Sequence, residues 1–278
     1  MKEFNEADLT NAVIERISKA ENARERFLLT SLVKHAHSFI RETKPSEAEW
    51  FSAIKFLLDS AKISDHARNE FILFSDILGV SMLVDSINNR KVNGGTESSV
   101  LGPFYQENAP DLENESSFIQ TDDNGEKVYI SGKVLDSLGN PISGATLDIW
   151  QTASNGLYHM QDNSQDQHNL CGKLTTDING NYSFTTIKPV SYAIPTDGPV
   201  GSFLNIYGSH PFRPAHIHFI ISADGYQSVT TELYSSDDKY LESDAVYGVK
   251  NSLIIEYIKD SKNPKSWTLN YDFSLELS

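Results

Sequence analysis

Apolar residues in the first hundred positions of the chain recur at helical spacing. Between residues 27 and 39 they lie three and four apart, as along one face of a helix. Ser46 and Glu49 form a capping box, which predicts that a second helix begins there. A long third helix is expected over 64–87, with its cap in the first two residues. The pattern therefore predicts a helical N-terminal part.

From residue 101 onward the pattern changes to short stretches in which apolar and polar residues alternate. Val128, Ile130 and Val134 alternate in this way, and turn-forming residues follow at 137–141. All 12 tyrosines lie at or after Tyr105, and tyrosine favours strands. Strands are expected over 127–136, 145–149, 182–186, 214–222, 227–234, 252–259 and 267–277.

These two patterns predict an α+β fold with two domains. A helical domain is expected over residues 1–100 and an antiparallel β-sandwich over residues 101–278. A chain of 278 residues, with 39% hydrophobic and 22% charged residues, is long enough and apolar enough to bury a core without disulfides.

Charge and cysteine content exclude several classes of function. The 38 acidic residues outnumber the 23 basic ones and give a net charge of −15, so sequence-independent binding to nucleic acid is not expected. No stretch approaches the roughly 20 apolar residues of a membrane helix, so membrane insertion is not expected either. Cys171 is the single cysteine, so no intramolecular disulfide can form. Together with an acidic, polar N-terminus, this favours a cytoplasmic location.

A pair of histidines is the sharpest candidate for chemistry. His216 and His218 are two residues apart on an expected strand, so both imidazoles lie on the same face and could bind one metal. Zinc and ferrous sites would need a further His, Asp, Glu or Cys, and the abundant tyrosines offer another kind of donor. Tyrosinate is a hard anion that favours a trivalent ion such as Fe(III). The alternative is two histidines on a polar face.

Four stretches of the sequence carry a resemblance to a known family. They are Leu101–Tyr105 (LGPFY), Ile130–Tyr158 (ISGKVLDSLGNPISGATLDIWQTASNGLY), Tyr182–Pro195 (YSFTTIKPVSYAIP) and Arg213–Phe219 (RPAHIHF). With these stretches the sequence resembles the intradiol ring-cleavage dioxygenases, which are non-haem iron enzymes, and the similarity covers nearly the whole chain. The resemblance implies that O₂ opens an aromatic diol between two adjacent hydroxyls and gives a muconate-type product.

The resemblance also implies the metal site. Its two tyrosine ligands match Tyr158 and Tyr192, its two histidine ligands match His216 and His218, and the expected ion is Fe(III). Tyr192 is implied to leave the metal and take a proton from the substrate. Arg213, which is always cationic, is implied to stabilise negative charge that develops during the reaction. The alternative for Arg213 is a structural salt bridge.

Substrate preference is less sharply indicated. Gly79–Asn88 and Tyr240–Leu253 are more similar to the enzymes that act on hydroxyquinol (benzene-1,2,4-triol), while catechol and chlorocatechol remain alternatives. Asp76 offers a partner for an additional ring hydroxyl, unless it is simply an exposed helix residue. At Glu232 the sequence departs from the glutamine that is common in catechol dioxygenases. The implied substrate-pocket positions are Leu73, Asp76, Val100, Leu101, Gly102, Pro103, Phe104, Ile194, Pro195, Arg213 and Val246.

Assembly is the last implication of the resemblance. The helical domain resembles the region that forms a homodimer in this family and encloses a lipid-like molecule, although an amphipathic helix more often covers its own core.

Two other classes of protein are alternatives to the enzyme. Gly132–Trp150 also resembles transthyretin-like sandwich modules that bind no metal, and a sandwich hydrolase with zinc or ferrous iron would use the same histidines.

Overall fold

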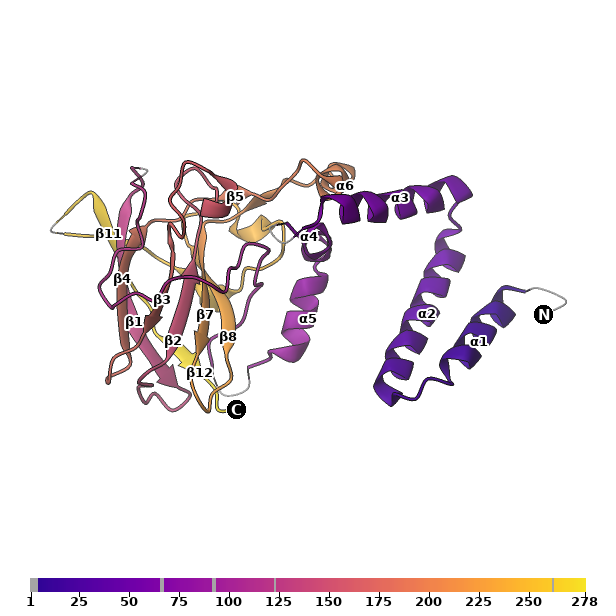
Figure 1. Ribbon diagram of the computed structural model, residues 1–278, viewed down its shortest axis with the longest axis horizontal. Helices are drawn as coiled ribbons and strands as arrows, with labels where there is room; N and C mark the ends of the chain where they lie inside the picture. The colour runs from indigo at the N-terminus through magenta and orange to yellow at the C-terminus, as the bar shows by residue number, and fades with distance from the viewer. Residues whose placement is uncertain (1–4, 66–67, 92–93, 123, 262) are drawn as a thin grey trace. The chain divides into compact units, whose positions relative to one another are not determined.

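Helices fill the N-terminal part of the chain and strands fill the rest (Figure 1). The computed structural model describes residues 5–65, 68–91, 94–122, 124–261 and 263–278. The chain divides into two units, Met1–Leu58 and Asp59–Ser278. None of the helices in these described ranges is long and apolar enough to cross a membrane.

The N-terminal unit consists of α1 (Glu6–Ile17), α2 (Ala23–Thr43) and most of α3 (Glu47–Ile63). The predicted capping box at the start of α3 is confirmed. The backbone N–H and the hydroxyl of Ser46 donate to Glu49 Oε2 at 2.7 and 2.8 Å, and the Glu49 backbone N–H donates to Ser46 Oγ at 3.3 Å. These bonds satisfy donors that the first turn of a helix leaves free.

The expected long helix over 64–87 is wrong, because it is two shorter helices. α4 (Glu70–Ile77) is capped by Asn69, whose side chain accepts from the backbone N–H of Ile72, rather than by Ser64 or Asp65. α5 (Val80–Asn88) follows directly. Between them Gly79 has φ +68°, and this left-handed conformation interrupts the helical hydrogen bonding.

Among the residues that the structure describes, the C-terminal unit contains two five-stranded sheets and one two-stranded sheet. Figure 1 shows β1 and β4 in one layer and β2, β7 and β8 in another. The first sheet contains β1 (Lys127–Asp136), β4 (Asn181–Ile187), β10 (Ile258–Lys259), β11 (Ser266–Asn270) and β12 (Phe273–Leu275). The second contains β2 (Thr146–Trp150), β3 (Cys171–Thr175), β7 (His216–Ser222), β8 (Val229–Ser235) and β9 (Ile254–Ile255). The small sheet pairs β5 (Tyr192–Ala193) with β6 (Phe212–Arg213).

The sheets are mixed, which corrects the expectation of an antiparallel sandwich while confirming the α+β class. β1 runs antiparallel to β4 but parallel to β11 and β12, and β8 runs parallel to β9. These parallel partners are far apart in the chain and need no hairpin between them. The strands expected over 252–259 and 267–277 are each two shorter strands.

A core between the two large sheets fixes the strand that carries the histidines. Val128, Ile130 and Val134 of β1 are fully buried, as their alternation predicts, and they belong to the same apolar cluster as Ile217 and Phe219 of β7. Because successive side chains of a strand face opposite ways, burial of Ile217 and Phe219 in this core turns the alternate residues of β7 to its other face.

One helix of this unit has no counterpart among the predictions. α6 (Pro199–Tyr207) contacts α4, begins with proline and is followed by Gly208 in the left-handed conformation. Proline at the first position and glycine just past the end are typical helix boundaries, so the sequence did contain a signal for α6. Within the described ranges, the other helical segments are single 3₁₀ turns at His159–Gln161, Leu241–Ser243 and Asn251–Leu253.

Candidate metal centre and substrate pocket

Four donor atoms from three parts of the chain meet in one buried place. Tyr158 precedes a 3₁₀ turn, Tyr192 lies on β5, and His216 and His218 share one face of β7. The two hydroxyl oxygens of Tyr158 and Tyr192 lie 3.3 Å apart. The Nε2 atom of His218 lies 3.0 Å from Tyr158 Oη and 3.2 Å from Nε2 of His216. All four side chains are buried. Donors placed about 2 Å from a common metal ion are themselves roughly 3 Å apart, so this set fits a single ion.

The surroundings of each imidazole set its orientation. His216 Nδ1 lies 2.7 Å from the carbonyl oxygen of Pro214, to which it donates in the tautomer that leaves Nε2 free as a ligand atom. The ring of His218 stacks on the indole of Trp150, with centroids 4.7 Å apart and planes inclined by 5°. Trp150 and His218 are direct partners in the pairing of β2 with β7, so the sheet register places this stack.

Burial controls the protonation of these four groups. Burial, followed by the positive charge of Arg213, lowers the pKa of His216 to about 3, and burial lowers the pKa of His218 to about 4. Burial also raises the pKa of Tyr158 well above its ordinary value and raises that of Tyr192, where Arg213 acts in the opposite direction. The imidazoles are therefore neutral and able to coordinate, whereas the phenols need a strongly charged cation to lose their protons.

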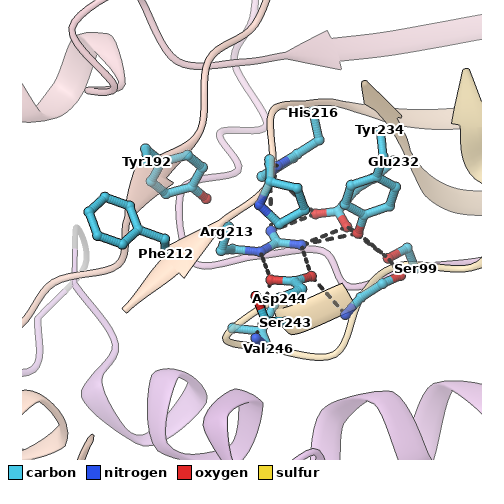
Figure 2. A network of polar contacts seen from close by, with 12 residues as sticks. Ser99, Tyr192, Phe212, Arg213, His216, Glu232, Tyr234, Ser243, Asp244 and Val246 are labelled. Atoms are coloured by element: carbon cyan, nitrogen blue, oxygen red, sulfur yellow. Dashed lines mark hydrogen bonds and ion pairs between the residues drawn. The ribbon is translucent and has the colours of Figure 1, made fainter. Parts of the chain in front are cut away.

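Arg213 lies at the centre of a polar network beside these donors (Figure 2). Its guanidinium pairs with Glu232 at 2.8 Å and with Asp244 at 3.1 Å, and its Nη1 lies 3.1 Å from His216 Nε2. Tyr234 Oη accepts from Arg213 Nη2 at 3.1 Å. The sequence identified Arg213 and Glu232 as notable, but Asp244 and Tyr234 carry no sequence signal, because their approach to Arg213 depends on how distant segments pack.

A pocket of about 780 Å³ is lined by some of the residues that the sequence predicted to bind the substrate. Asp76 of α4 and the consecutive residues Val100, Leu101, Gly102 and Pro103 line it. A Cβ atom at Gly102 would lie 3.2 Å from His218 Cε1, so this segment passes directly beside the metal donors. The pocket therefore adjoins the candidate metal centre.

Asp76 is buried, at 3% exposed, so it is not a surface residue of the helix. Burial raises the pKa of Asp76 to about 6, against opposing effects of Ser81 and Arg213. Leu73, three residues earlier on α4, is also buried, as expected for residues on one helix face.

The remaining predicted pocket positions are not among the residues that line this pocket. Phe104 stacks on the ring of Tyr158, with centroids 4.7 Å apart. Ile194 is buried two residues after Tyr192, and Pro195 follows it half-buried. Val246 is buried, and its backbone N–H donates to Asp244 Oδ1 at 3.3 Å.

Comparison with known proteins identifies the family of this chain. Residues 100–277 match the family described as Dioxygenase, and residues 22–96 match the one described as Catechol dioxygenase N terminus. The hydroxyquinol 1,2-dioxygenase of Rhizobium sp. (strain MTP-10005) is 40% identical, over 98% of this chain and 96% of that protein.

Solved structures are similar over the same length. A hydroxyquinol 1,2-dioxygenase from Pseudomonas putida DLL-E4 is 42% identical with a TM-score of 0.90, over 98% of this chain and 99% of that one. A catechol 1,2-dioxygenase from Pseudomonas arvilla C-1 is 29% identical with a TM-score of 0.86, over 98% and 92%.

The fold and the matches together define an oxidoreductase that adds O₂ to its substrate. The chain belongs to the intradiol ring-cleavage dioxygenase family, whose metal is non-haem iron. Family membership argues against both the transthyretin-like module and the hydrolase.

Proposed function

We propose that Tyr158, Tyr192, His216 and His218 hold Fe(III) in this enzyme. The observation that carries the proposal is the chain of donor contacts at 3.0 to 3.3 Å inside a buried site. Two phenolates and two neutral imidazoles leave Fe(III) with one net positive charge, which suits a further anionic ligand. When bound, Fe(III) supplies Lewis acidity that favours the deprotonated diol and its reaction with O₂.

The substrate that we propose is hydroxyquinol, cleaved between its two adjacent hydroxyls to give 3-hydroxy-cis,cis-muconate, which is a tautomer of maleylacetate. Relatives at 40 to 42% identity are named for this substrate. The buried carboxyl group of Asp76 lines the pocket and offers a hydrogen-bonding partner for the hydroxyl that catechol lacks. A site built to bond a hydroxyl discriminates strongly against the analogue without it, because its polar group is then left unpaired.

Tyr192 accepts a proton from the diol in this proposal, while Tyr158 stays in place. The ring of Tyr158 is held by the stack with Phe104 and by the 3.0 Å contact with His218. Tyr192 lies on a two-residue strand, and its hydroxyl contacts Tyr158 at the longer distance of 3.3 Å. The contact with His218 is therefore the one that distinguishes Tyr158 as the phenol that stays in place. Burial of the whole site excludes water from the reacting groups.

Oxygen uptake across a set of diols tests the substrate proposal. We expect the highest kcat/KM with hydroxyquinol, and we expect Asp76→Asn to lower kcat/KM for hydroxyquinol by at least tenfold more than for catechol. A higher kcat/KM for catechol or a chlorocatechol would replace the proposal with the runner-up. That runner-up is favoured by a catechol 1,2-dioxygenase of Candida albicans, which is 38% identical over 96% of this chain.

Iron content tests the ligand set separately from the substrate. His218→Ala should retain little iron and lose the charge-transfer colour of tyrosinate on Fe(III). His210→Ala is the matched control, because His210 contacts Ser243 and not the donors. Full iron content and colour in the His218 variant would reject the assignment.

A homodimer and a lipid-like molecule at its interface complete the proposal. Every side chain of α2 is at least partly exposed, although the helix carries Phe27, Leu32 and Phe39 at 60 to 63% exposure. Exposed apolar surface of this kind is typical of a protein or lipid contact. Light scattering of the purified protein and extraction of bound lipid test both points.

A cytoplasmic location is proposed as well, and the buried, unpaired Cys171 suits a reducing compartment.

A further inference from the structure

Glu232 is a fully buried carboxylate that sits directly across the sheet from a proposed iron ligand. It is 0% exposed, and the pairing of β7 with β8 places it opposite His218. Both of its oxygens bind Arg213, with Oε1 at 2.8 Å from Nη1 and Oε2 at 2.9 Å from Nη2. Oε2 also accepts from Ser99 Oγ at 2.7 Å and from the Tyr234 hydroxyl. This number of donors keeps the carboxylate ionised and fixed in place.

The guanidinium of Arg213 is shared between two carboxylates (Figure 2). Asp244 binds it on the other edge, with Oδ1 3.1 Å from Nε and Oδ2 3.2 Å from Nη2. One cation between two anions gives this buried group a net charge of −1. Arg213 is therefore not a free positive charge beside the metal donors, and the arrangement agrees with the structural alternative for this residue.

The same carboxylate of Glu232 reaches the metal donors. Its Oε1 lies 3.1 Å from His218 Nδ1 and 3.6 Å from His216 Nε2. The Nδ1 atom of His218 has no aligned hydrogen-bond partner within the described part of the chain, so the contact with Glu232 is electrostatic. A fixed negative charge this close to the outer nitrogen of a histidine ligand makes that ligand more basic through space.

We propose that Glu232 is a positioning residue of this metal centre, which places a fixed negative charge beside His218 and balances Arg213 so that the site favours Fe(III) over Fe(II). The inference rests on the proposed ligand set. Its physical basis is that a fixed negative charge in a buried site stabilises the more highly charged ion more strongly. Glu232 acts through His218 and Arg213 and does not touch the reacting atoms.

Two isosteric variants separate this role from a general effect of charge. Glu232→Gln and Asp244→Asn each remove one negative charge from Arg213, but only the first removes it from His218. We expect Glu232→Gln to lower the ratio of Fe(III) to Fe(II) affinity by about tenfold, which raises the one-electron reduction potential by about 59 mV. We expect Asp244→Asn to change that ratio by less than about threefold. Spectroelectrochemistry of the iron-loaded proteins measures both.

Equal shifts in the two variants, or no shift in the Glu232 variant, would overturn the inference. If Glu232→Gln does not fold, Glu232→Asp keeps the charge but withdraws it from His218, and an intermediate rise in potential is expected. An unchanged reduction potential in Glu232→Asp would also overturn the inference. Iron content of the parent protein keeps the two proposals distinct, because a parent that binds no iron rejects the ligand set itself.

A second group of metal-binding side chains lies outside the proposed iron site. His159, His168 and Cys171 present ligand atoms that all lie within 4.8 Å of one another, and His168 Nδ1 is 3.9 Å from Cys171 Sγ. The histidines are partly exposed and the thiol is buried, so an ion could enter from the side of the imidazoles. Tetrahedral zinc, bound at about 2.0 to 2.3 Å from nitrogen and sulfur, places its ligands roughly 3.3 to 3.7 Å apart. The contact between His168 and Cys171 at 3.9 Å is close to this spacing, and the remaining ligand atoms would move together when the ion binds.

We infer that these three side chains form a site for a soft divalent cation such as Zn²⁺, with water as the fourth ligand. Thiolate and imidazole together favour Zn²⁺ over Mg²⁺ or Ca²⁺. Cys171 begins β3 and His168 comes three residues earlier, so the sheet fixes one ligand and the preceding turn supplies another.

Titration of the iron-loaded protein with Co²⁺ tests this second site. The parent should bind one Co²⁺ with the absorption of a thiolate-to-cobalt charge transfer, and Zn²⁺ should displace it. His168→Ala should weaken Co²⁺ binding by at least tenfold, while His210→Ala, a histidine outside the group, should not. The absence of the thiolate band in the parent, or unchanged binding in the His168 variant, would refute the site.

Discussion

The imidazole of His218 lies flat against the indole of Trp150, with ring centroids 4.7 Å apart and planes inclined by 5°. The stack fixes the plane of a proposed iron ligand, and Trp150 is 4% exposed. Two consequences follow, one for the stability of the sandwich and one for the retention of iron.

Trp150→Leu should reduce both the stability of the protein and its retention of iron. Loss of the large buried ring is expected to lower the free energy of unfolding by about 2–4 kcal/mol, and the freed His218 ring should lower iron content after dialysis against a chelator. Trp267→Leu is the control, because Trp267 lies on β11 in the other large sheet, contacts two lysines and should affect stability alone. Denaturant unfolding and iron analysis measure the two effects. Iron retention equal to that of the Trp267 variant would contradict the role of the stack.

The two tyrosines are expected to differ in what their phenylalanine variants lose. Tyr192→Phe should reduce kcat by at least about 100-fold, in the range of a lost acid–base group, while retaining most of the iron. Tyr158→Phe should lose more iron, because Tyr158 also contacts His218 at 3.0 Å. Single-turnover oxygen uptake normalised to bound iron distinguishes the variants. A Tyr192 variant with the parental rate per iron would reject its role as proton acceptor.

Asp76 is expected to make the protein less stable as the pH rises. Burial raises its pKa from 3.8 to about 6, so between these pH values the folded protein keeps a proton that the unfolded chain has lost. The free energy of unfolding therefore falls as pH rises through this window, by up to about 3 kcal/mol, and the loss persists above it.

Asp76→Asn should remove this contribution, so the difference between variant and parent should grow from pH 4 to pH 6. Asp162→Asn provides a control of opposite sign. Hydrogen bonds from Ser164, followed by that from Asn155, lower the pKa of Asp162 to about 2, so its contribution is lost as pH falls toward 2. Denaturant unfolding measures both variants, over pH 4 to 6 for Asp76→Asn and below pH 4, down to about pH 2, for Asp162→Asn. A flat difference curve for Asp76→Asn would show that its carboxyl group titrates normally in the fold.

Local patterns in the sequence predicted the elements but not their junctions. The capping box at Ser46 and the alternation of β1 depend on residues close in the chain, and both predictions are confirmed. The break at Gly79 was missed, because its left-handed conformation is accompanied by packing against the ring of Tyr247, more than 160 residues away.

The same distinction holds at the site. The spacing of His216 and His218 predicted that both side chains lie on one face of a strand, because the two residues are close in the chain. The pairing of Trp150 with His218 and the approach of Asp244 to Arg213 depend on strand register and loop packing, which no local pattern encodes.

Gly102 is a left-handed glycine that packs against a proposed iron ligand. Its φ of +73° is in the region that glycine adopts without strain, and a Cβ atom there would lie 3.2 Å from Cε1 of His218. Gly102→Ala should therefore lower the free energy of unfolding by about 1–2 kcal/mol through backbone strain and, in addition, push His218 out of alignment with the other donors. Iron affinity should fall by at least tenfold, as expected when a ligand loses its support.

Gly139→Ala is the matched control for this prediction. Gly139 has φ +84°, and no atom lies within 4 Å of the Cβ that alanine would add. It should therefore show the backbone strain without any displacement of His218. Comparable stability losses in the two variants, with iron affinity lowered only in Gly102→Ala, are expected from denaturant unfolding and from iron titration monitored by the charge-transfer band. If both variants bind iron as the parent does, His218 tolerates the added methyl group, and the close approach of Gly102 is not what holds His218 in line with the other donors.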